Sequence, residues 1–414
     1  MSHQKEKAFW WRSHKYGLDA SSMGTGKTLP VIELLQDTGE HVVVAPAFLL
    51  RNWRNELQKF AGETAAIFPA RARITLVSQD QIYKPQVMPI FASARYVAVD
   101  EAHGFGNPSS RRSKALHGYV EKYSPERLML LTGTPLKNRI PELYSLLRLI
   151  DYGYNRGFRT SFRNQHVFSS RYCQQMTQRI RGHHVIKFYG EKNLKELKEQ
   201  WLGPIYIRQR LEDLDLVPEV IYESVQADAD KVEKETDELL EQGWRAMEQF
   251  TKPPEAVSTA KKLSAIAKAG WTAAYARQLL ESSEEPLVIF SDHVDPCHAI
   301  SKALVEFGCE IITGATPMAA RQDTVDKFQT GKIRVIVGTI GACGTGITLT
   351  RASTVIFNDL SYVPAQNAQA IGRLRRIGQK STVVAVTVCR PGIDERISEQ
   401  LRAKEQTISN VLGE

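Results

Sequence analysis

One glycine-rich segment of the chain has the residue types and spacing that bind phosphate groups. Residues 22–28 read Ser-Met-Gly-Thr-Gly-Lys-Thr and open a helical pattern. In such a turn the backbone N–H groups surround phosphates, the lysine reaches the outer oxygens and the last threonine binds a magnesium ion. The first glycine of the usual pattern is Ser21 here, and a structural glycine turn is the alternative. The predicted nucleotide contacts in this segment are Met23, Gly24, Thr25, Gly26, Lys27 and Thr28.

Two adjacent acidic residues follow an apolar run and complete a candidate hydrolytic centre. Asp100 and Glu101 come directly after residues 96–99, which have the composition of a buried strand. Hydrolysis of a nucleotide requires a metal ion that bridges phosphate oxygens and a group that orients the attacking water. We assign Asp100, together with Thr28, to a magnesium ion and Glu101 to the water. On its own, an Asp-Glu pair in a turn is usually only a polar surface feature.

A histidine and two threonines could relay the state of this centre. His103 ends the sequence Asp-Glu-Ala-His, and Thr132 and Thr134 lie in Leu-Thr-Gly-Thr-Pro after the apolar run 128–131. We predict that the two hydroxyls hydrogen bond the acidic loop and transmit the nucleotide state to a nucleic-acid surface. A plain Gly-Pro turn is the competing interpretation.

A distant arginine cluster supplies positive charge for the same chemistry. Residues 369–379 read Gln-Ala-Ile-Gly-Arg-Leu-Arg-Arg-Ile-Gly-Gln. Guanidinium groups stabilise the charge of a transferred phosphoryl group, and Arg373 and Arg376 would share one face of a helix. If a second lobe carries them, hydrolysis requires the two lobes to close. The alternative is a basic helix surface. The predicted catalytic residues are Lys27, Asp100, Glu101, Arg373 and Arg376.

Strand and helix patterns alternate along the chain in two series. Short β-branched runs at 41–45 and 96–99 suit buried strands, and apolar residues recur at helical spacing in 52–60 and 141–149. Five later strand candidates lie at 286–290, 310–312, 333–337, 354–357 and 382–386. The alternation predicts an α/β fold with parallel sheets and functional loops at the carboxyl ends of the strands. We expect an ATP-binding lobe at 1–205, a helical linker or start of the second lobe at 206–285, and the second lobe at 286–414.

Composition restricts the class of protein and its compartment. The 414 residues include 54 Lys and Arg against 46 Asp and Glu, a net charge of +8 that permits an anionic partner. No run approaches the roughly 20 apolar residues of a membrane span, and the N-terminus lacks the apolar core of a signal peptide. The five scattered cysteines predict free thiols. We therefore expect an intracellular location, cytoplasmic or in the nucleoid if the chain is bacterial or phage-encoded.

The excess positive charge is concentrated in a basic and aromatic insert, residues 152–190, which contain no Asp or Glu. Its cations could neutralise nucleic-acid phosphates and its rings could stack on bases. The alternative is a solvated basic face whose rings are core, and for any single ring we prefer the core. On charge alone, the nucleic-acid candidates are Lys137, Arg156, Arg159 and Arg163.

These motifs together resemble those of superfamily 2 nucleic-acid motors, and within them the Swi2/Snf2 double-stranded-DNA translocases. The narrower resemblance rests on residues 45–56, on 131–139 with Glu142-Leu143 downstream, and on the Arg-Ile-Gly-Gln of 376–379. Residues 338–350 look like motif V, and His3-Gln4 lies where the family has its adenine-reading glutamine. The chain departs from the family pattern at Ser21-Ser22, Cys343, Tyr362-Val363-Pro364 and Gly372.

The resemblance implies two RecA-like lobes and hydrolysis of ATP with Mg²⁺, stimulated by DNA. It adds Gln4, Gly346 and Gln369 to the nucleotide contacts. Both lobes would follow the phosphates of a duplex, largely independently of sequence and with strong salt dependence. By motif position, the implied nucleic-acid contacts are Pro46, Arg51, Asn52, Ser78, Ser291 and Thr339. The expected protein is a compact, monomeric motor without large insertions.

Three functions remain open at this point. The first is a duplex DNA translocase that remodels forks, branched junctions or protein–DNA complexes. The second is a strand-separating helicase acting on forked or branched DNA, with a short β-hairpin hidden in the basic and aromatic insert. The third is a nucleic-acid-binding scaffold with silent motor chemistry, which the complete set of catalytic residues argues against.

Overall fold

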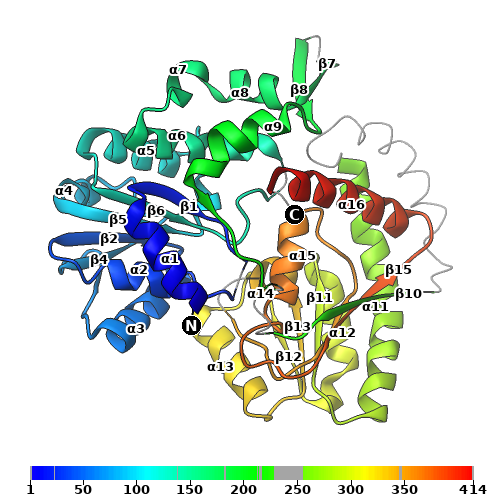
Figure 1. Ribbon diagram of the computed structural model, residues 1–414. Coiled ribbons are helices and arrows are strands. Elements are labelled where there is room, and N and C mark those ends of the chain that lie inside the picture. Colours follow the sequence, from blue (N-terminus) through cyan, green and yellow to red (C-terminus); the bar gives the residue numbers. More distant parts are fainter. Residues whose placement is uncertain are drawn as a thin grey trace. The chain divides into compact units, whose positions relative to one another are not determined.

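The computed structural model describes residues 2–22, 24–137, 139–180, 183–211, 213, 217–227, 255–344 and 347–412. The chain divides into two units: residues 1–174, 190–214 and 407–414 form the first, and residues 175–189 and 215–406 form the second. Each unit is built on its own parallel sheet (Figure 1). Within the described residues, no helix is long and apolar enough to cross a bilayer.

The sheet of the first unit has seven parallel strands in the order β3-β4-β2-β5-β6-β1-β9. Its central strands are short apolar runs in which successive residues are buried on both faces, as expected for a parallel sheet. The strands are β1 (Tyr16–Asp19), β2 (Glu40–Ala45), β3 (Ala66–Ile67), β4 (Ile74–Ser78), β5 (Ala94–Asp100), β6 (Arg127–Leu131) and β9 (Tyr206–Ile207).

Helices cover both faces of this sheet. On one face α1 (Ser2–Ser13), α2 (Thr28–Leu34) and α3 (Leu50–Ala61) pack their apolar residues, among them Trp11 and Trp53, against the strands. Figure 1 shows α4 (Met88–Ser93), α5 (Arg111–Tyr123) and α6 (Leu143–Tyr154) on the opposite side of the sheet. The strand ends are therefore the part of the sheet left open for chemistry.

Strand register brings the predicted phosphate loop and the acidic pair together. Leu131 at the end of β6 is the partner of Asp19 on β1 and also of Asp100 on β5. The loop that follows β1 and the loop that follows β5 thus leave the sheet on either side of one strand. The carboxyl end of β6 carries Thr132 between them.

The second unit repeats the design with six parallel strands in the order β10-β15-β14-β11-β13-β12. The strands are β10 (Val220–Gln226), β11 (Leu287–Ser291), β12 (Cys309–Ile312), β13 (Val335–Thr339), β14 (Thr354–Phe357) and β15 (Val383–Cys389). The expectation of two α/β lobes of RecA-like type is confirmed.

Two helix layers enclose the second sheet. Core residues of α11 (Glu255–Ser282) and α12 (Val294–Ala303) pack on one face, and those of α13 (Met318–Gln329), α14 (Ile340–Cys343) and α15 (Pro364–Ile371) pack on the other. Buried lysines anchor α11: Lys268 donates to Val388 O at 2.8 Å and to Asp394 Oδ2 at 2.6 Å. Asp394 lies on α16 (Ile393–Leu412).

Four of the eight aromatic residues of the insert are core. Phe158, Phe162, Phe168 and Tyr172 are at most 6% exposed and form a cluster with Trp201. They belong to the short helices α7 (Phe158–Ser161) and α8 (Gln165–Tyr172) and to the segment 197–202. The core alternative to base stacking is therefore confirmed for these four rings.

The same insert contains a two-stranded sheet formed by β7 (Gln174–Ile180) and β8 (His183–Tyr189). The sequence allowed for a short hairpin here without locating it. Tyr189 at the end of β8 is 42% exposed.

Several strands were absent from the prediction. β1 and β9 of the first sheet are too short to give a strand pattern, whereas β4 of the first sheet and β10 of the second contain β-branched residues and were overlooked. Within residues 206–285, expected to be a helical linker or the start of the second lobe, β9 belongs to the first sheet and β10 to the second, and α11 packs on the second sheet. Residues 228–254 of that range lie outside the described residues.

Candidate nucleotide site

The glycine-rich loop between β1 and α2 has the backbone that phosphate binding requires. Gly24 and Gly26 have φ values of +81° and +71°, which glycine adopts without strain. Lys27 Nζ donates to the carbonyl oxygens of Ser21 at 2.8 Å and Ser22 at 3.0 Å, so the ammonium lies inside the loop. Burial lowers the pKa of Lys27, while the charges of Asp19, Glu101 and Asp100 raise it. Met23, a predicted contact, lies outside the described residues.

The predicted adenine-reading residue lies against this loop. The Gln4 amide of α1 packs directly on the backbone of Gly26, where a Cβ would lie 2.3 Å from Gln4 Nε2. Gln4 is half-buried there. The structure thus brings Gln4 to the same loop as Lys27.

Asp100 lies at the end of β5 with both carboxylate oxygens held. Oδ1 accepts from the backbone N–H of Glu101 at 2.8 Å, and Oδ2 accepts from Trp53 Nε1 of α3 at 2.9 Å. Burial and the charge of Glu101 raise the pKa of Asp100 to about 6, against the opposing effects of Trp53 and Lys27. Trp53 was noted in the sequence only for its helical spacing, and nothing in that spacing indicates that its indole faces a carboxylate.

The same helix also reaches the second predicted magnesium ligand. Glu56 accepts hydrogen bonds from Asn52 and from the side chain of Thr28. Burial raises the pKa of Glu56. Helix α3 therefore contacts both Asp100 and Thr28, through side chains three residues apart that share one helix face.

His103 connects the acidic loop to the end of β6. Its Nδ1 lies 3.1 Å from Glu101 Oε2, 2.9 Å from Thr132 Oγ1 and 3.2 Å from Thr134 Oγ1. Thr132 in turn donates its backbone N–H to Asp19 O at 3.0 Å, next to the glycine-rich loop. The three residues predicted to couple the site to a neighbouring loop are thus in mutual contact.

Glu101 has a backbone conformation that side chains seldom adopt. Its φ is +49°, in the left-handed region, and Gln79 holds it there by donating from Nε2 to Asp100 O at 2.8 Å and Glu101 O at 3.2 Å. Gln79 is 5% exposed and was not predicted as a site residue. Its only sequence signal is its position directly after the candidate Ser78.

The loop is also bonded to the segment that follows β9. Ser22 N donates to Gln209 O at 2.9 Å, Gln209 N donates to Ser21 Oγ at 3.0 Å, and Arg208 donates to Ala20 O at 2.8 Å. Arg208 and Gln209 lie near the end of residues 190–214, the stretch of the first unit after which the chain continues into the second unit.

In the second unit, the two predicted catalytic arginines lie beyond a helix. α15 ends at Ile371, so the expectation that Arg373 and Arg376 share a helix face is wrong; the glycine at 372 and following turns end the helix first. Arg373 donates to Gly344 O and Ile347 O, and Arg376 donates to Thr348 Oγ1 at 2.8 Å. Both arginines therefore bond to the segment that follows α14, Arg373 at Gly344 and Ile347 and Arg376 at the neighbouring Thr348.

The other nucleotide contacts predicted in this unit are Gln369 and Gly346. Gln369 is 6% exposed on α15, and its Oε1 lies 4.0 Å from the position of a Cβ on Gly344. Gly346 lies outside the described residues.

Two of the four nucleic-acid candidates predicted from charge, Arg156 and Arg159, already interact with other residues of the first unit. Arg159 donates to Asp151 Oδ2 at 3.2 Å and lies over the ring of Tyr152, and Arg156 donates to the carbonyls of Gln200 and Trp201. Lys137 is half-buried, and burial lowers its pKa. Arg163 is exposed.

The candidates from motif position differ in accessibility. Arg51 and Asn52 are exposed near the start of α3, and Pro46, directly after β2, is half-buried. Ser78, Ser291 and Thr339, each at the carboxyl end of a strand, are at most 8% exposed. Ser291 donates to Asp359 Oδ1.

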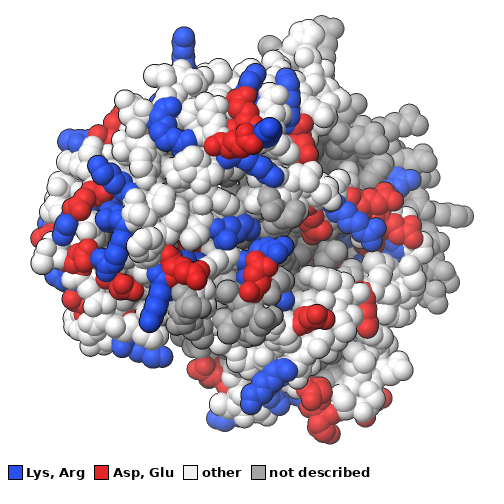
Figure 2. Space-filling model, viewed as in Figure 1, with Lys and Arg blue, Asp and Glu red and all other residues white. Residues whose placement is uncertain are grey.

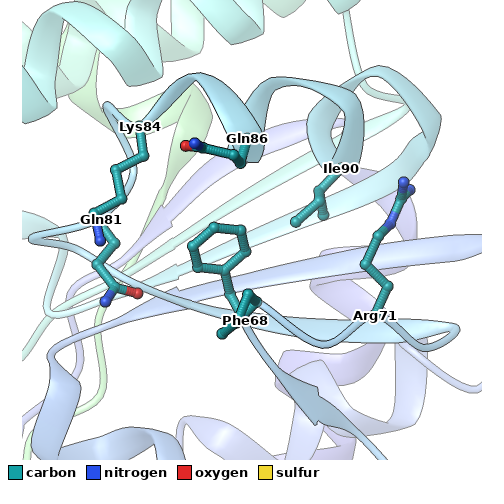
Figure 3. Close-up of a pocket in the computed structure, with 7 residues that line it drawn as sticks. Phe68, Arg71, Gln81, Lys84, Gln86 and Ile90 are labelled. Carbon is teal, nitrogen blue, oxygen red and sulfur yellow. The ribbon is translucent and has the colours of Figure 1, made fainter.

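Surface charge does not by itself mark a nucleic-acid path. On the face drawn in Figure 2, Lys and Arg side chains are interspersed with Asp and Glu over the described part of the surface. Figure 3 shows a cavity of about 720 Å³ with two cations at its edge, Arg71 and Lys84, and an apolar floor that includes Phe68. It is formed by the loops around β3 and α4, and none of the predicted site residues lines it.

One cluster in the second unit has metal-ligating side chains. Asp292, His293 and Asp359 have ligand atoms within 4.8 Å of one another. Lys261 Nζ is 2.5 Å from Asp292 Oδ2 and 3.6 Å from Asp359 Oδ2. The buried ammonium of α11 already supplies the cation that these carboxylates require.

Comparison with known families decides the relationship of the chain. Residues 3–235, more than half of its length, match the SNF2-related domain. The chain belongs to the SNF2-related family. Residues 271–378 of this SNF2-related chain also match the helicase conserved C-terminal domain. The narrower resemblance predicted from the motifs is therefore confirmed.

Relatives of this SNF2-related chain include an uncharacterized ATP-dependent helicase of Mycoplasma pneumoniae, 27% identical over 100% of this chain and 42% of the relative. The mouse DNA annealing helicase and endonuclease ZRANB3 is 27% identical over 95% of this chain and 39% of its own length. The chain thus spans about two fifths of these relatives. Among solved structures, the Sulfolobus solfataricus SWI2/SNF2 ATPase core in complex with dsDNA is 21% identical, with a TM-score of 0.43 over 99% of this chain and 91% of that one.

Proposed function

We propose that this chain is an ATP-dependent translocase on double-stranded DNA whose ATPase activity is stimulated by DNA. The observation that carries the proposal is the chain of contacts from Asp100 through Glu101 and His103 to Thr132 and Thr134, with the charge of Lys27 interacting with both carboxylates. A hydrolytic centre bonded to a second loop can pass its state to a surface that holds another ligand. Membership in the SNF2-related family and the helicase names of its relatives support this reading.

In this proposal ATP and Mg²⁺ occupy the site formed by the glycine-rich loop and the ends of β5 and β6. Lys27 holds the outer phosphates, Thr28 and Asp100 hold the metal ion, and Glu101 orients the attacking water. Mg²⁺ would supply charge neutralisation at the phosphates. Hard oxygen ligands from one carboxylate and one hydroxyl suit this ion. Arg373 and Arg376 act on the phosphoryl group when the lobes close.

Trp53→Phe should weaken Mg²⁺ binding. The substitution removes a hydrogen bond that favours the charged form of Asp100, so we expect about a fivefold loss of Mg²⁺ affinity in the presence of ATP. Because the pKa of Asp100 is already raised to about 6, its carboxylate is lost as pH falls through that value. Removing Trp53 raises the pKa of Asp100 further, so the loss of Mg²⁺ affinity on acidification should begin at a higher pH in the variant than in wild type.

Magnesium titrations of nucleotide binding between pH 5 and 8, read by fluorescence, test this prediction. Trp11→Phe is the matched control, because Trp11 belongs to the same core cluster and its Nε1 has no hydrogen-bond partner. Equal losses in both variants would show that packing alone is responsible.

The translocase proposal predicts ATP turnover that depends on the nucleic acid supplied. At fixed salt, duplex DNA should raise the ATPase rate at least about tenfold, and a third strand should be displaced from a triplex as ATP is consumed. ATPase rates with duplex, single-stranded, forked and RNA ligands provide the measurement. Turnover that is indifferent to DNA would contradict the proposal, and no turnover with any ligand would favour the silent scaffold.

A strand-separating helicase is the second candidate, and the two-stranded sheet β7–β8 favours it. A short β ribbon could act as a wedge between DNA strands, and remodelling of forks or branched junctions fits either candidate. Unwinding of forked DNA by the chain, measured beside triplex displacement, distinguishes the two. In both cases we propose that the chain acts as a monomer.

A further inference from the structure

A buried lysine and a buried aspartate lie behind the glycine-rich loop. Lys7 of α1 and Asp19 at the end of β1 are both 0% exposed, with 3.6 Å between Lys7 Nζ and Asp19 Oδ2. Lys7 Nζ also donates to Thr25 Oγ1 at 3.2 Å. Neither residue was a site candidate from the sequence, where Lys7 resembles the other charged residues of an N-terminal helix.

This pair holds the loop at two points. Asp19 Oδ1 accepts from the backbone N–H of Ser21 at 2.9 Å, before the glycines. Thr25, itself 0% exposed, lies between the glycines and donates to Ser22 O at 2.9 Å. The ammonium and the carboxylate together therefore fix the loop on either side of Gly24.

Charge explains why the two groups must occur together. The charge of Asp19 acts on Lys27, the residue proposed to hold the phosphates. A buried carboxylate without a counter-ion would be costly and would repel a polyphosphate. Burial lowers the pKa of Lys7 to about 8, with Asp19 opposing that effect, so the ammonium is still the major form at pH 7.

We propose that Lys7 is a positioning residue of the phosphate loop, which neutralises the buried charge of Asp19 so that the loop accepts a polyphosphate. This inference rests on the proposed nucleotide site. It concerns residues beneath the loop, whereas Lys27 acts on the phosphates directly.

The test is a double-mutant cycle read by binding of fluorescent ATP, ADP and AMP analogues. Lys7→Met leaves Asp19 unpaired and should weaken ATP binding about tenfold or more. Lys7→Met/Asp19→Asn keeps an acceptor for Ser21 and removes both charges, so it should return to within about threefold of wild type. Lys5→Met, at an exposed position of the same helix, is the matched control and should bind as wild type does.

Two further readouts separate this role from loss of packing. Repulsion by Asp19 should make the loss in Lys7→Met largest for ATP, smaller for ADP and smallest for AMP. Thermal unfolding of each variant accompanies the binding data.

The outcomes distinguish this inference from the proposed function. If wild type binds none of the three nucleotides, the nucleotide site itself is wrong. If wild type binds ATP and Lys7→Met binds it equally well, or if the double variant stays as weak as the single one, the role of Lys7 is overturned alone. Should Lys7→Met fail to fold, the double variant still decides, because recovery of folding without recovery of ATP affinity contradicts the inference.

Discussion

Lys27→Ala is expected to lower ATP turnover by roughly a thousandfold or more while leaving most of the DNA affinity intact. The ammonium lies within the glycine-rich loop, bonded to Ser21 O and Ser22 O, and the charges of the surrounding carboxylates oppose the lowering of its pKa by burial. Its loss removes the positive charge proposed to meet the outer phosphates. Steady-state ATPase rates with saturating duplex DNA, combined with DNA binding by fluorescence anisotropy, provide the measurement.

Lys59→Ala serves as the control for the Lys27 variant, because Lys59 is exposed on α3 and lies over the ring of Phe60. It should keep wild-type turnover. If Lys27→Ala hydrolyses ATP at a rate within about tenfold of wild type, the glycine-rich loop is not the phosphate-binding site. Loss of DNA binding in parallel with turnover would instead indicate a folding defect.

Arg373→Lys is expected to reduce turnover by on the order of a thousandfold, with ATP affinity changed by less than about threefold. Lysine keeps the charge but cannot reproduce the fork of donors that stabilises phosphoryl transfer. Arg373 also donates to Gly344 O and Ile347 O, so a structural effect of the substitution has to be separated from an effect on chemistry. Single-turnover kinetics and nucleotide binding, measured together, separate the chemical step from binding.

Arg375→Lys is the control for this second prediction. Arg375 is adjacent in sequence but donates to Pro218 O at 2.8 Å, away from the loop that Arg373 and Arg376 contact. Turnover should stay near the wild-type rate in this variant. If Arg373→Lys loses thermal stability and DNA binding to the same degree as turnover, a structural role of Arg373 explains the loss of turnover and the catalytic role is contradicted.

The sequence predicted the two-lobe fold because the strongest strands are continuous apolar runs. β2, β5 and the strands of the six-stranded sheet other than β10 were located closely in this way. β1 was missed because its four residues, Tyr-Gly-Leu-Asp, include a glycine and end on a charge. Its assignment requires the neighbours that bury it, and those neighbours are distant in sequence.

The candidate site was predictable where a motif fixes residue types, and less so where packing selects a partner. Lys27, Asp100, Glu101 and His103 lie together because β1, β5 and β6 are adjacent in a parallel sheet. Trp53, Gln79 and Lys7 are ordinary in the sequence, since an indole, an amide or an ammonium acquires its role only from the group it meets in the fold. The arginines were placed on a helix because their spacing allowed it, but Gly372 and the turns after it end α15 first.

The bonds between the glycine-rich loop and residues 207–209 have a mechanical consequence. That segment carries the chain out of the first unit, so Gln209 and Arg208 tether the exit strand to Ser21, Ser22 and Ala20. A change in the position of the loop would therefore be passed directly to the backbone that follows β9, without any side chain of the sheet core between them.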